Sequence, residues 1–284
     1  LGLWGEDQIW VIQRVLPICG RSWEGAAVAG SLDAGAGAGL APVATSDAPS
    51  GSADFRISVM ELSNGVSSGM TDPQMLANDP VWAPDSQMIA FVSVRGGPRQ
   101  LYTQPIGSAT ASMVFESPQD PKWLDDWSAD GKYLLFHRPR PSKLYLVELA
   151  NPKTARVLME TSEVIDGAHF SPDGKWVAYQ VSENGVYQVW VAAFPAFDHR
   201  RRVSSQGGGM AFWHGVGELF YLSPTGQLFS VKVTPLSSGD LEFAAPVLLF
   251  QSPQLSPQLT VDAYAPTKDG QKFLFIKPRS TATR

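Results

Sequence analysis

The sequence is poor in cysteine, in charge and in long apolar runs. Cys19 is the only cysteine among 284 residues, so the chain cannot form an internal disulfide. Charged residues make up 17% of the chain, and the net charge of −5 supplies no basic face for nucleic acid. No apolar run approaches the ~20 residues that a membrane helix needs. We therefore expect no disulfide, no nucleic-acid partner and no membrane span within this chain.

Recognisable metal and catalytic motifs are missing as well. None of the histidines forms an H-x-x-H or H-E-x-x-H pair, so we predict no metal and no cofactor. A weak alternative is a cation held by Asp120, Asp125 and Asp126, although no D-x-D-x-D-G loop surrounds them. Residues 65–69 match the G-x-S-x-G nucleophile elbow, but Pro73 argues against the helix that this motif requires. With no kinase or hydrolase motif elsewhere, we predict that the chain is not an enzyme.

What the sequence does contain is a repeated hairpin pattern, clearest over residues 169–179. There Ser171-Pro172-Asp173-Gly174 predicts a tight turn. Proline presets φ, aspartate bonds its own backbone, and glycine accepts a positive φ. The residues on either side are aromatic and β-branched, as is typical of strands.

The pattern recurs at a nearly fixed period. Its aromatic anchors Trp82, Trp127, Phe170 and Trp213 lie 45, 43 and 43 positions apart by subtraction. A four-stranded propeller blade repeats every ~40–45 residues, and no helical periodicity competes with this interpretation. Because they recur at one blade position, several residues are assigned to turn geometry rather than to chemistry. These are Asp85, Asp130, Asp173, Gly174, Asp269 and Gly270.

The sequence thus predicts an all-β fold: a β-propeller of four-stranded antiparallel blades, six in number, with one incomplete or shared between the termini. We expect an irregular segment or linker over 1–53: residues 3–18 hold enough apolar side chains for a short helix or strand, and about 20–53 is rich in Gly, Ala, Pro and Ser. The propeller follows over 54–278 and a tail over 279–284. Residues 55–62 resemble the outer half of a blade. Its inner strands are expected either upstream of this chain or around 261–276, the latter closing the ring.

Ring geometry predicts where a ligand would bind. The loops that enter the inner strands converge at one mouth of the central channel, and they carry several carboxylates. We therefore name a ligand site of Asp79, Asp126, Asp166 and His169. Such a mouth favours a cationic ligand or a peptide, so the expected partner is a protein, a peptide or a small ligand. The basic residues 199–202 are expected in a solvated loop.

The repeats resemble a known family. Residues 170–179 follow the TolB-type, WD40-like (PD40) pattern aromatic-S-P-D-G-K-x-hydrophobic-A-aromatic, and residues 82–91 and 127–136 follow it closely. The longer stretches 93–102, 218–224 and 269–275 are similar to the C-terminal propeller of acidobacterial-type bacterial serine/threonine kinases. The resemblance covers about 56–277. Departures are Ser86 for the turn glycine, Ala129 for the turn proline, and residues 1–53, which do not match that family's preceding blade.

This resemblance implies a non-catalytic module that binds a ligand or a protein, as the sensor or scaffold part of a bacterial kinase-type receptor. It implies an extracytoplasmic or periplasmic location, although nothing in the composition excludes the cytoplasm. Two alternatives stay open: the gating propeller of a prolyl-oligopeptidase-like peptidase, and a free TolB-like periplasmic scaffold. No kinase segment is present, so no kinase activity is assigned to this chain.

Overall fold

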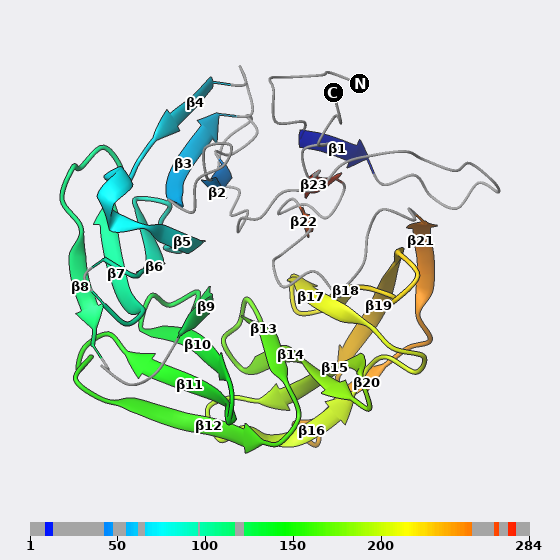
Figure 1. The fold of residues 1–284 in the computed structure, drawn as a ribbon. Helices are drawn as coiled ribbons and strands as arrows, with labels where there is room; N and C mark the ends of the chain where they lie inside the picture. Colours follow the sequence, from blue (N-terminus) through cyan, green and yellow to red (C-terminus); the bar gives the residue numbers. More distant parts are fainter. Residues whose placement is uncertain are drawn as a thin grey trace.

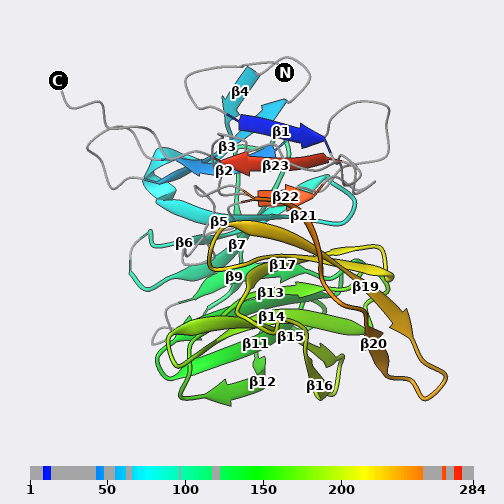
Figure 2. The ribbon, with the colours of Figure 1, turned by 90° about the vertical axis from the view of Figure 1, so that its right-hand side faces the viewer.

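The computed structural model describes residues 9–13, 43–47, 55–61, 66–95, 97–116, 122–251, 264–266 and 272–276. Within these ranges the chain forms six antiparallel sheets arranged around a central axis (Figure 1). Each sheet is one blade, and the blades are stacked around the ring as Figure 2 shows from the side. The prediction of an all-β propeller with six blades is therefore confirmed.

Three consecutive blades have the expected four strands in simple meander order. Blade 2 consists of β5 (Ala77–Trp82), β6 (Met88–Ser93), β7 (Gln100–Pro105) and β8 (Ser112–Phe115). Blade 3 consists of β9 (Trp123–Trp127), β10 (Tyr133–Pro139), β11 (Ser142–Glu148) and β12 (Ala155–Thr161). Blade 4 consists of β13 (Ile165–Phe170), β14 (Trp176–Glu183), β15 (Val186–Ala193) and β16 (Asp198–Arg202).

The remaining blades depart from this order. Blade 5 has five strands: β17 (Gly209–His214), β18 (Glu218–Leu222), β19 (Gln227–Pro235), β20 (Leu241–Phe243) and β21 (Val247–Gln251). The long strand β19 pairs with β20 near its end and with β21 near its start. Blade 1 consists of β2 (Val43–Asp47), β3 (Arg56–Glu61) and β4 (Val66–Gly69), followed by the short 3-10 helix η1 (Pro73–Met75).

The first strand of the chain closes the ring, which corrects two expectations. Blade 6 joins β22 (Tyr264–Pro266) and β23 (Lys272–Ile276) to β1 (Ile9–Gln13), so the C-terminal hairpin pairs with β1 and not with residues 55–62. The inner strand of blade 1 is β2, which pairs with β3. Strand β1 lies within residues 3–18, where a short helix or strand is expected. Strand β2 lies in the part of 1–53 expected to be a linker, so that expectation is wrong for β2. The predicted tail over 279–284 lies outside the described residues.

Apolar side chains fill the spaces between neighbouring blades. One cluster joins blades 3 and 4 through Leu135, Leu146, Phe170 and Tyr179, all buried. The anchor Trp82 is buried, and the indole nitrogen of Trp127 donates to the Gly131 carbonyl at 3.2 Å. The repeated aromatic residues therefore pack in or against the core of their blades, which explains why they recur at the blade period.

The repeated aspartates hold the turns between the first two strands of their blades. The carboxylates of Asp85, Asp130 and Asp173 each accept a hydrogen bond from the backbone N–H two residues later, at 2.9, 3.1 and 3.2 Å. The next residue has a positive φ, 75° at Gly131 and 66° at Gly174. Asp269 and Gly270 lie outside the described residues.

The inner strands of blades 2, 4 and 5 share one irregularity. Their pairing with the second strand shifts register, and the shifted stretch contains Asp79, Gly167 or Met210. These residues have φ of 51°, 54° and 52°, in the left-handed region. Blade 3 shifts register next to Asp125. A β-bulge redirects the side chains around it. The register shifts of blades 2 to 5 therefore determine which inner-strand side chains face the centre of the ring.

Two smaller points complete the fold. The basic residues expected in a loop lie in β16, the outermost strand of blade 4, where all five residues are exposed. Among the described residues, no helix has the length and apolar character needed to span a membrane.

Candidate functional site

Acidic side chains from the inner strands of blades 2, 3 and 4 gather at the register shifts, together with basic side chains from blades 2 and 3. The tightest group consists of Asp125, His137 and Asp166, whose potential ligand atoms all lie within 4.8 Å of one another. Their side chains are 3%, 9% and 16% exposed. We call this group the Asp–His–Asp cluster. It joins two blades, because Asp125 and His137 belong to blade 3 and Asp166 to blade 4.

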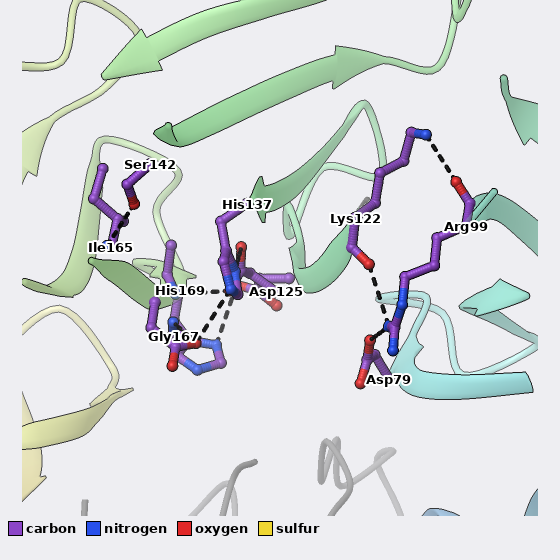
Figure 3. Close-up of polar contacts among 12 residues, drawn as sticks. Asp79, Arg99, Lys122, Asp125, His137, Ser142, Ile165, Gly167 and His169 are labelled. Atoms are coloured by element: carbon purple, nitrogen blue, oxygen red, sulfur yellow. Dashed lines mark hydrogen bonds and ion pairs between the residues drawn. The ribbon is translucent and has the colours of Figure 1, made fainter. Parts of the chain in front are cut away.

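The imidazole of His137 is held from two sides. Its Nδ1 lies 2.9 and 3.0 Å from the two carboxylate oxygens of Asp125 (Figure 3). Its Nε2 lies 3.6 Å from Asp166 Oδ1. The ring also stacks on Trp123, with centroids 5.8 Å apart. These contacts fix the plane of the imidazole and direct Nε2 toward Asp166.

Each carboxylate of the cluster is in turn held by the backbone of blade 4. Asp166 Oδ1 accepts a hydrogen bond from the Gly167 N–H at 2.8 Å. Asp125 Oδ1 accepts a long one from the Ala168 N–H at 3.4 Å. The register shift of β13 therefore supplies donors to both blades and keeps the cluster in place.

A third carboxylate, Asp79 of blade 2, lies next to the cluster and is paired with Arg99. Arg99 Nη1 lies 3.2 Å from Asp79 Oδ2. It also donates to the Lys122 carbonyl at 3.3 Å, while Lys122 Nζ donates to the Arg99 carbonyl at 2.8 Å (Figure 3). The guanidinium lies 4.6 Å from the Trp123 ring. This reciprocal pairing ties blade 2 to blade 3 directly beside the acidic groups.

The electrostatics of the site follow from burial and from the crowding of like charges. Desolvation raises the pKa of Asp79 from 3.8 to about 6, although Arg99 and His137 oppose this change. Burial by itself lowers the pKa of His137, but the carboxylates of Asp125, Asp166 and Asp79 outweigh it and raise the pKa to about 9. Desolvation lowers the pKa of Lys122 to about 8. The imidazole is therefore protonated at neutral pH as long as no bound cation lies next to it.

The structure divides the four site residues named from the sequence into two pairs. Asp79 and Asp166 lie at the acidic group, whereas Asp126 and His169 form a separate contact between blades 3 and 4. There Asp126 Oδ2 accepts a hydrogen bond from the Phe170 N–H at 2.7 Å and lies 3.9 Å from His169 Nδ1. Asp79, Asp126 and Asp166 lie within the inner strands and not in the loops before them, which corrects their expected location, whereas His169 lies near the end of its strand as expected.

Sequence reasoning did not select His137 or Arg99. His137 lies on β10, the second strand of its blade, and reaches the site because it pairs with Trp123 of β9. The only local signal was an ionisable residue directly after the apolar run 133–136. Arg99 directly precedes β7 of the same blade as Asp79, and the pairing of β5 and β7 with the strand between them, β6, brings it to that carboxylate.

This geometry favours binding of a positive charge. The hydrogen-bond partners described for His137 are carboxylate oxygens, so the ring is not paired with a hydroxyl or thiol that it could activate as a nucleophile. Three buried or mostly buried carboxylates, those of Asp79, Asp125 and Asp166, face the two cations His137 and Arg99. The nitrogen and oxygen atoms of the cluster are also ligands that a divalent metal ion accepts.

Comparison with known proteins supports the fold. No family model matches the chain. An uncharacterised protein of Agrobacterium fabrum is 27% identical over 116 residues, and that match covers 40% of this chain and 39% of that protein. The chain thus matches well under half the length of that relative.

Solved structures with low sequence identity share the architecture. The structure of a TolB-assigned protein of Agrobacterium tumefaciens superposes with a TM-score of 0.56 at 18% identity, covering 78% of this chain and 82% of that one. A gluconolactonase of Xanthomonas campestris superposes with a TM-score of 0.62 at 14% identity, covering 97% and 91%. These likenesses show a TolB-like six-bladed propeller, a fold that both binding proteins and enzymes use.

Proposed function

We propose that this TolB-like propeller is a non-catalytic binding module whose acidic inner-strand site recognises a positively charged ligand. The observation that carries the proposal is the convergence of Asp79, Asp125 and Asp166 from three consecutive blades. Burying like charges together is costly unless a cation offsets them. The cost is reflected in the raised pKa of Asp79, which Arg99 only partly counteracts.

A basic peptide is the first ligand class to consider. Ammonium and guanidinium groups are the cations that proteins present to one another, and carboxylates accept their hydrogen bonds in strong, charge-assisted pairs. The inner strands carry these carboxylates at bulges, where side chains are aimed toward the axis. A chain terminus or a loop of a partner protein could therefore be bound at the channel.

In the cell this module serves, in our proposal, as the sensor or scaffold part of a bacterial kinase-type receptor outside the cytoplasm. That assignment rests on the sequence resemblance over residues 56–277. The alternative of a free periplasmic scaffold is favoured by the structural likeness to the TolB-assigned protein. The two differ in their partner: a kinase-bearing receptor in the first case and envelope proteins in the second.

Calorimetric titration with short peptides tests the binding proposal. We expect the tripeptide Lys-Ala-Arg to bind and Glu-Ala-Glu not to bind. A triple variant with alanine at Asp79, Asp125 and Asp166 should bind the basic peptide at least tenfold more weakly. The matched control removes the same charge from exposed outer-strand positions, with alanine at Glu160, Asp198 and Glu242. Equal affinity of both triple variants for the basic peptide would contradict the proposal.

A further inference from the structure

We propose that the Asp–His–Asp cluster is a binding site for one divalent metal ion of the zinc and manganese type. This names the cation recognised at the acidic site, and so it rests on the proposed function. The ligands are His137 Nε2 and a carboxylate oxygen of Asp166. Asp125 is not counted as a ligand, because both of its carboxylate oxygens lie beside His137 Nδ1, on the other side of the ring from Nε2; it orients the imidazole.

The separation of the two ligand atoms suits a shared ion. His137 Nε2 and Asp166 Oδ1 lie 3.6 Å apart. Two ligands bound to one zinc ion at ~2.1 Å in tetrahedral geometry are about 3.4 Å apart. The observed spacing is thus longer than a normal hydrogen bond and close to that between neighbouring ligands of a metal ion.

The imidazole is already arranged as a metal ligand. A histidine that binds a metal donates its other ring N–H to a carboxylate or carbonyl, which fixes the tautomer and the ring orientation. Here the carboxylate of Asp125 lies 2.9 and 3.0 Å from His137 Nδ1 and takes that role. Stacking on Trp123 prevents rotation of the ring, and the Gly167 N–H holds the carboxylate of Asp166.

Charge balance selects a divalent ion. Binding at Nε2 requires the neutral imidazole, so the ion replaces the Nε2 proton, which is released to solvent. The negative charges of Asp79, Asp125 and Asp166 are then matched by Arg99 and the two charges of the ion. A monovalent cation at the same place would leave one carboxylate uncompensated in a largely buried site.

The mixture of ligand atoms narrows the choice of metal. Calcium and magnesium prefer all-oxygen sites with six or more ligands, whereas an imidazole nitrogen with carboxylate oxygens suits zinc and its transition-metal neighbours. Two protein ligands leave at least two positions of a four-coordinate ion for water or for a ligand group. A partner's carboxylate or carbonyl could therefore bind through the ion.

The test is calorimetric titration of the chelator-treated, full-length chain with zinc chloride, manganese chloride and calcium chloride. We expect one ion of zinc or manganese per chain and at least tenfold weaker binding of calcium. His137→Gln and Asp166→Asn should each lower zinc affinity at least 100-fold, and Asp125→Asn by 10–100-fold. Cobalt titration should give visible absorption bands of a nitrogen- and oxygen-ligated site, which His137→Gln abolishes.

The matched control is Asp126→Asn. It changes the neighbouring carboxylate on the same strand, but that side chain contacts the Phe170 N–H and the His169 ring instead of the cluster. The asparagine can still accept the Phe170 hydrogen bond, so the variant should fold and bind zinc like the unaltered protein. Circular dichroism and thermal unfolding confirm that each variant is folded before its affinity is compared.

The outcomes separate this inference from the proposed function. If no transition metal binds the unaltered chain, or if His137→Gln binds zinc as tightly as Asp126→Asn does, the metal site is wrong. If metal fails but Lys-Ala-Arg still binds, the acidic site recognises an organic cation and only the metal assignment falls. If neither binds, both proposals fall.

Discussion

At the scale of single residues, burial has the largest effect on Asp79. Its side chain is 20% exposed and has Arg99 as its ion-pair partner, yet desolvation raises its pKa to about 6. An acid whose folded-state pKa exceeds its unfolded value destabilises the fold as the pH rises from that unfolded value through the folded one. The destabilisation therefore grows between pH 3.8 and about 6 and is complete above this window.

Asp79→Asn should remove this penalty. Asparagine tolerates the left-handed φ of 51° and can still accept the hydrogen bond of Arg99. In chelator-treated protein we expect the variant to be more stable by about 2 kcal/mol at pH 7.5 and about equal to the unaltered chain at pH 3.5. Urea unfolding at the two pH values measures this. Asp198→Asn, at an exposed position, is the control, and a gain that does not depend on pH would contradict the explanation.

Lys122 gives the opposite case, a buried amine. Desolvation lowers its pKa from 10.5 to about 8, so the folded state holds the charged form less well than the unfolded state does. Stability from this group should rise as the pH increases from about 8 to 10.5. Lys122→Met should lose that rise, whereas the exposed Lys175→Met should keep it. Denaturant midpoints measured across this range decide the matter, and parallel curves for the two variants would show that Lys122 titrates normally.

At the scale of elements, the approach to the inner strand β17 is packed closely enough to exclude a further side chain. A Cβ added at Gly208, just before β17, would lie 2.6 Å from the Tyr221 ring and 3.3 Å from the Leu222 carbonyl. A Cβ at Gly69 on β4 would meet nothing within 4 Å. Neither glycine has a positive φ, so the comparison isolates packing from backbone strain.

Gly208→Ala should therefore destabilise the protein by about 1–3 kcal/mol, as overpacking of a filled core does. Gly69→Ala should cost less than about 0.5 kcal/mol. Both values come from chemical denaturation under the same conditions. Similar costs for the two substitutions would mean that Tyr221 moves aside and that the approach to β17 is less tightly packed than the structure indicates.

The elements also show what the sequence could predict. The hairpin of β13 and β14 was predictable, because its turn residues and its large apolar residues are both local signals. Strand β2 was not, because an inner strand lies where the blades converge and is built here from Val43-Ala44-Thr45-Ser46-Asp47, which lacks large alternating side chains. The strand that β2 pairs with is determined by the arrangement of the blades around the ring, and no local sequence pattern indicates that partner.

The same distinction holds for the site. Asp79 and Asp166 could be named because each occupies the inner-strand position of its repeat. The pairing of Asp125 with His137 could not, because it depends on a register shift between β9 and β10 that moves one residue relative to its neighbours. The rule that metal-binding histidines occur in closely spaced motifs applies to single helices and loops. A propeller gathers its ligands from strands about one blade apart.

At the scale of the whole molecule, the ring depends on one strand from the N-terminal region. All five residues of β1 pair with β23, from Ile9 opposite Ile276 to Gln13 opposite Lys272. Removing β1 would expose the edge of β23 and leave blade 6 as a two-stranded hairpin, which is at best marginally stable by itself.

Deletion of residues 1–13 should thus lower stability by at least about 2 kcal/mol, or roughly 4–8 °C in Tm for a chain of this size. Deletion of residues 1–7 alone keeps β1 and serves as the control. Differential scanning calorimetry measures both. In our proposal the zinc ligands belong to blades 3 and 4. The fraction of the shortened protein that remains folded should therefore bind zinc with unchanged affinity. An unchanged Tm after the longer deletion would show that β1 contributes little to closure.

The register of blade 6 has one more consequence. Because Ile276 ends β23 directly opposite Ile9, which begins β1, a two-residue turn could connect them and make the propeller one uninterrupted circle. The backbone of such a circle can be opened elsewhere, and the exposed turn between β19 and β20 offers a place to open it. A circularly permuted chain that starts there should rebuild the same ring, with its ends moved to the rim of blade 5.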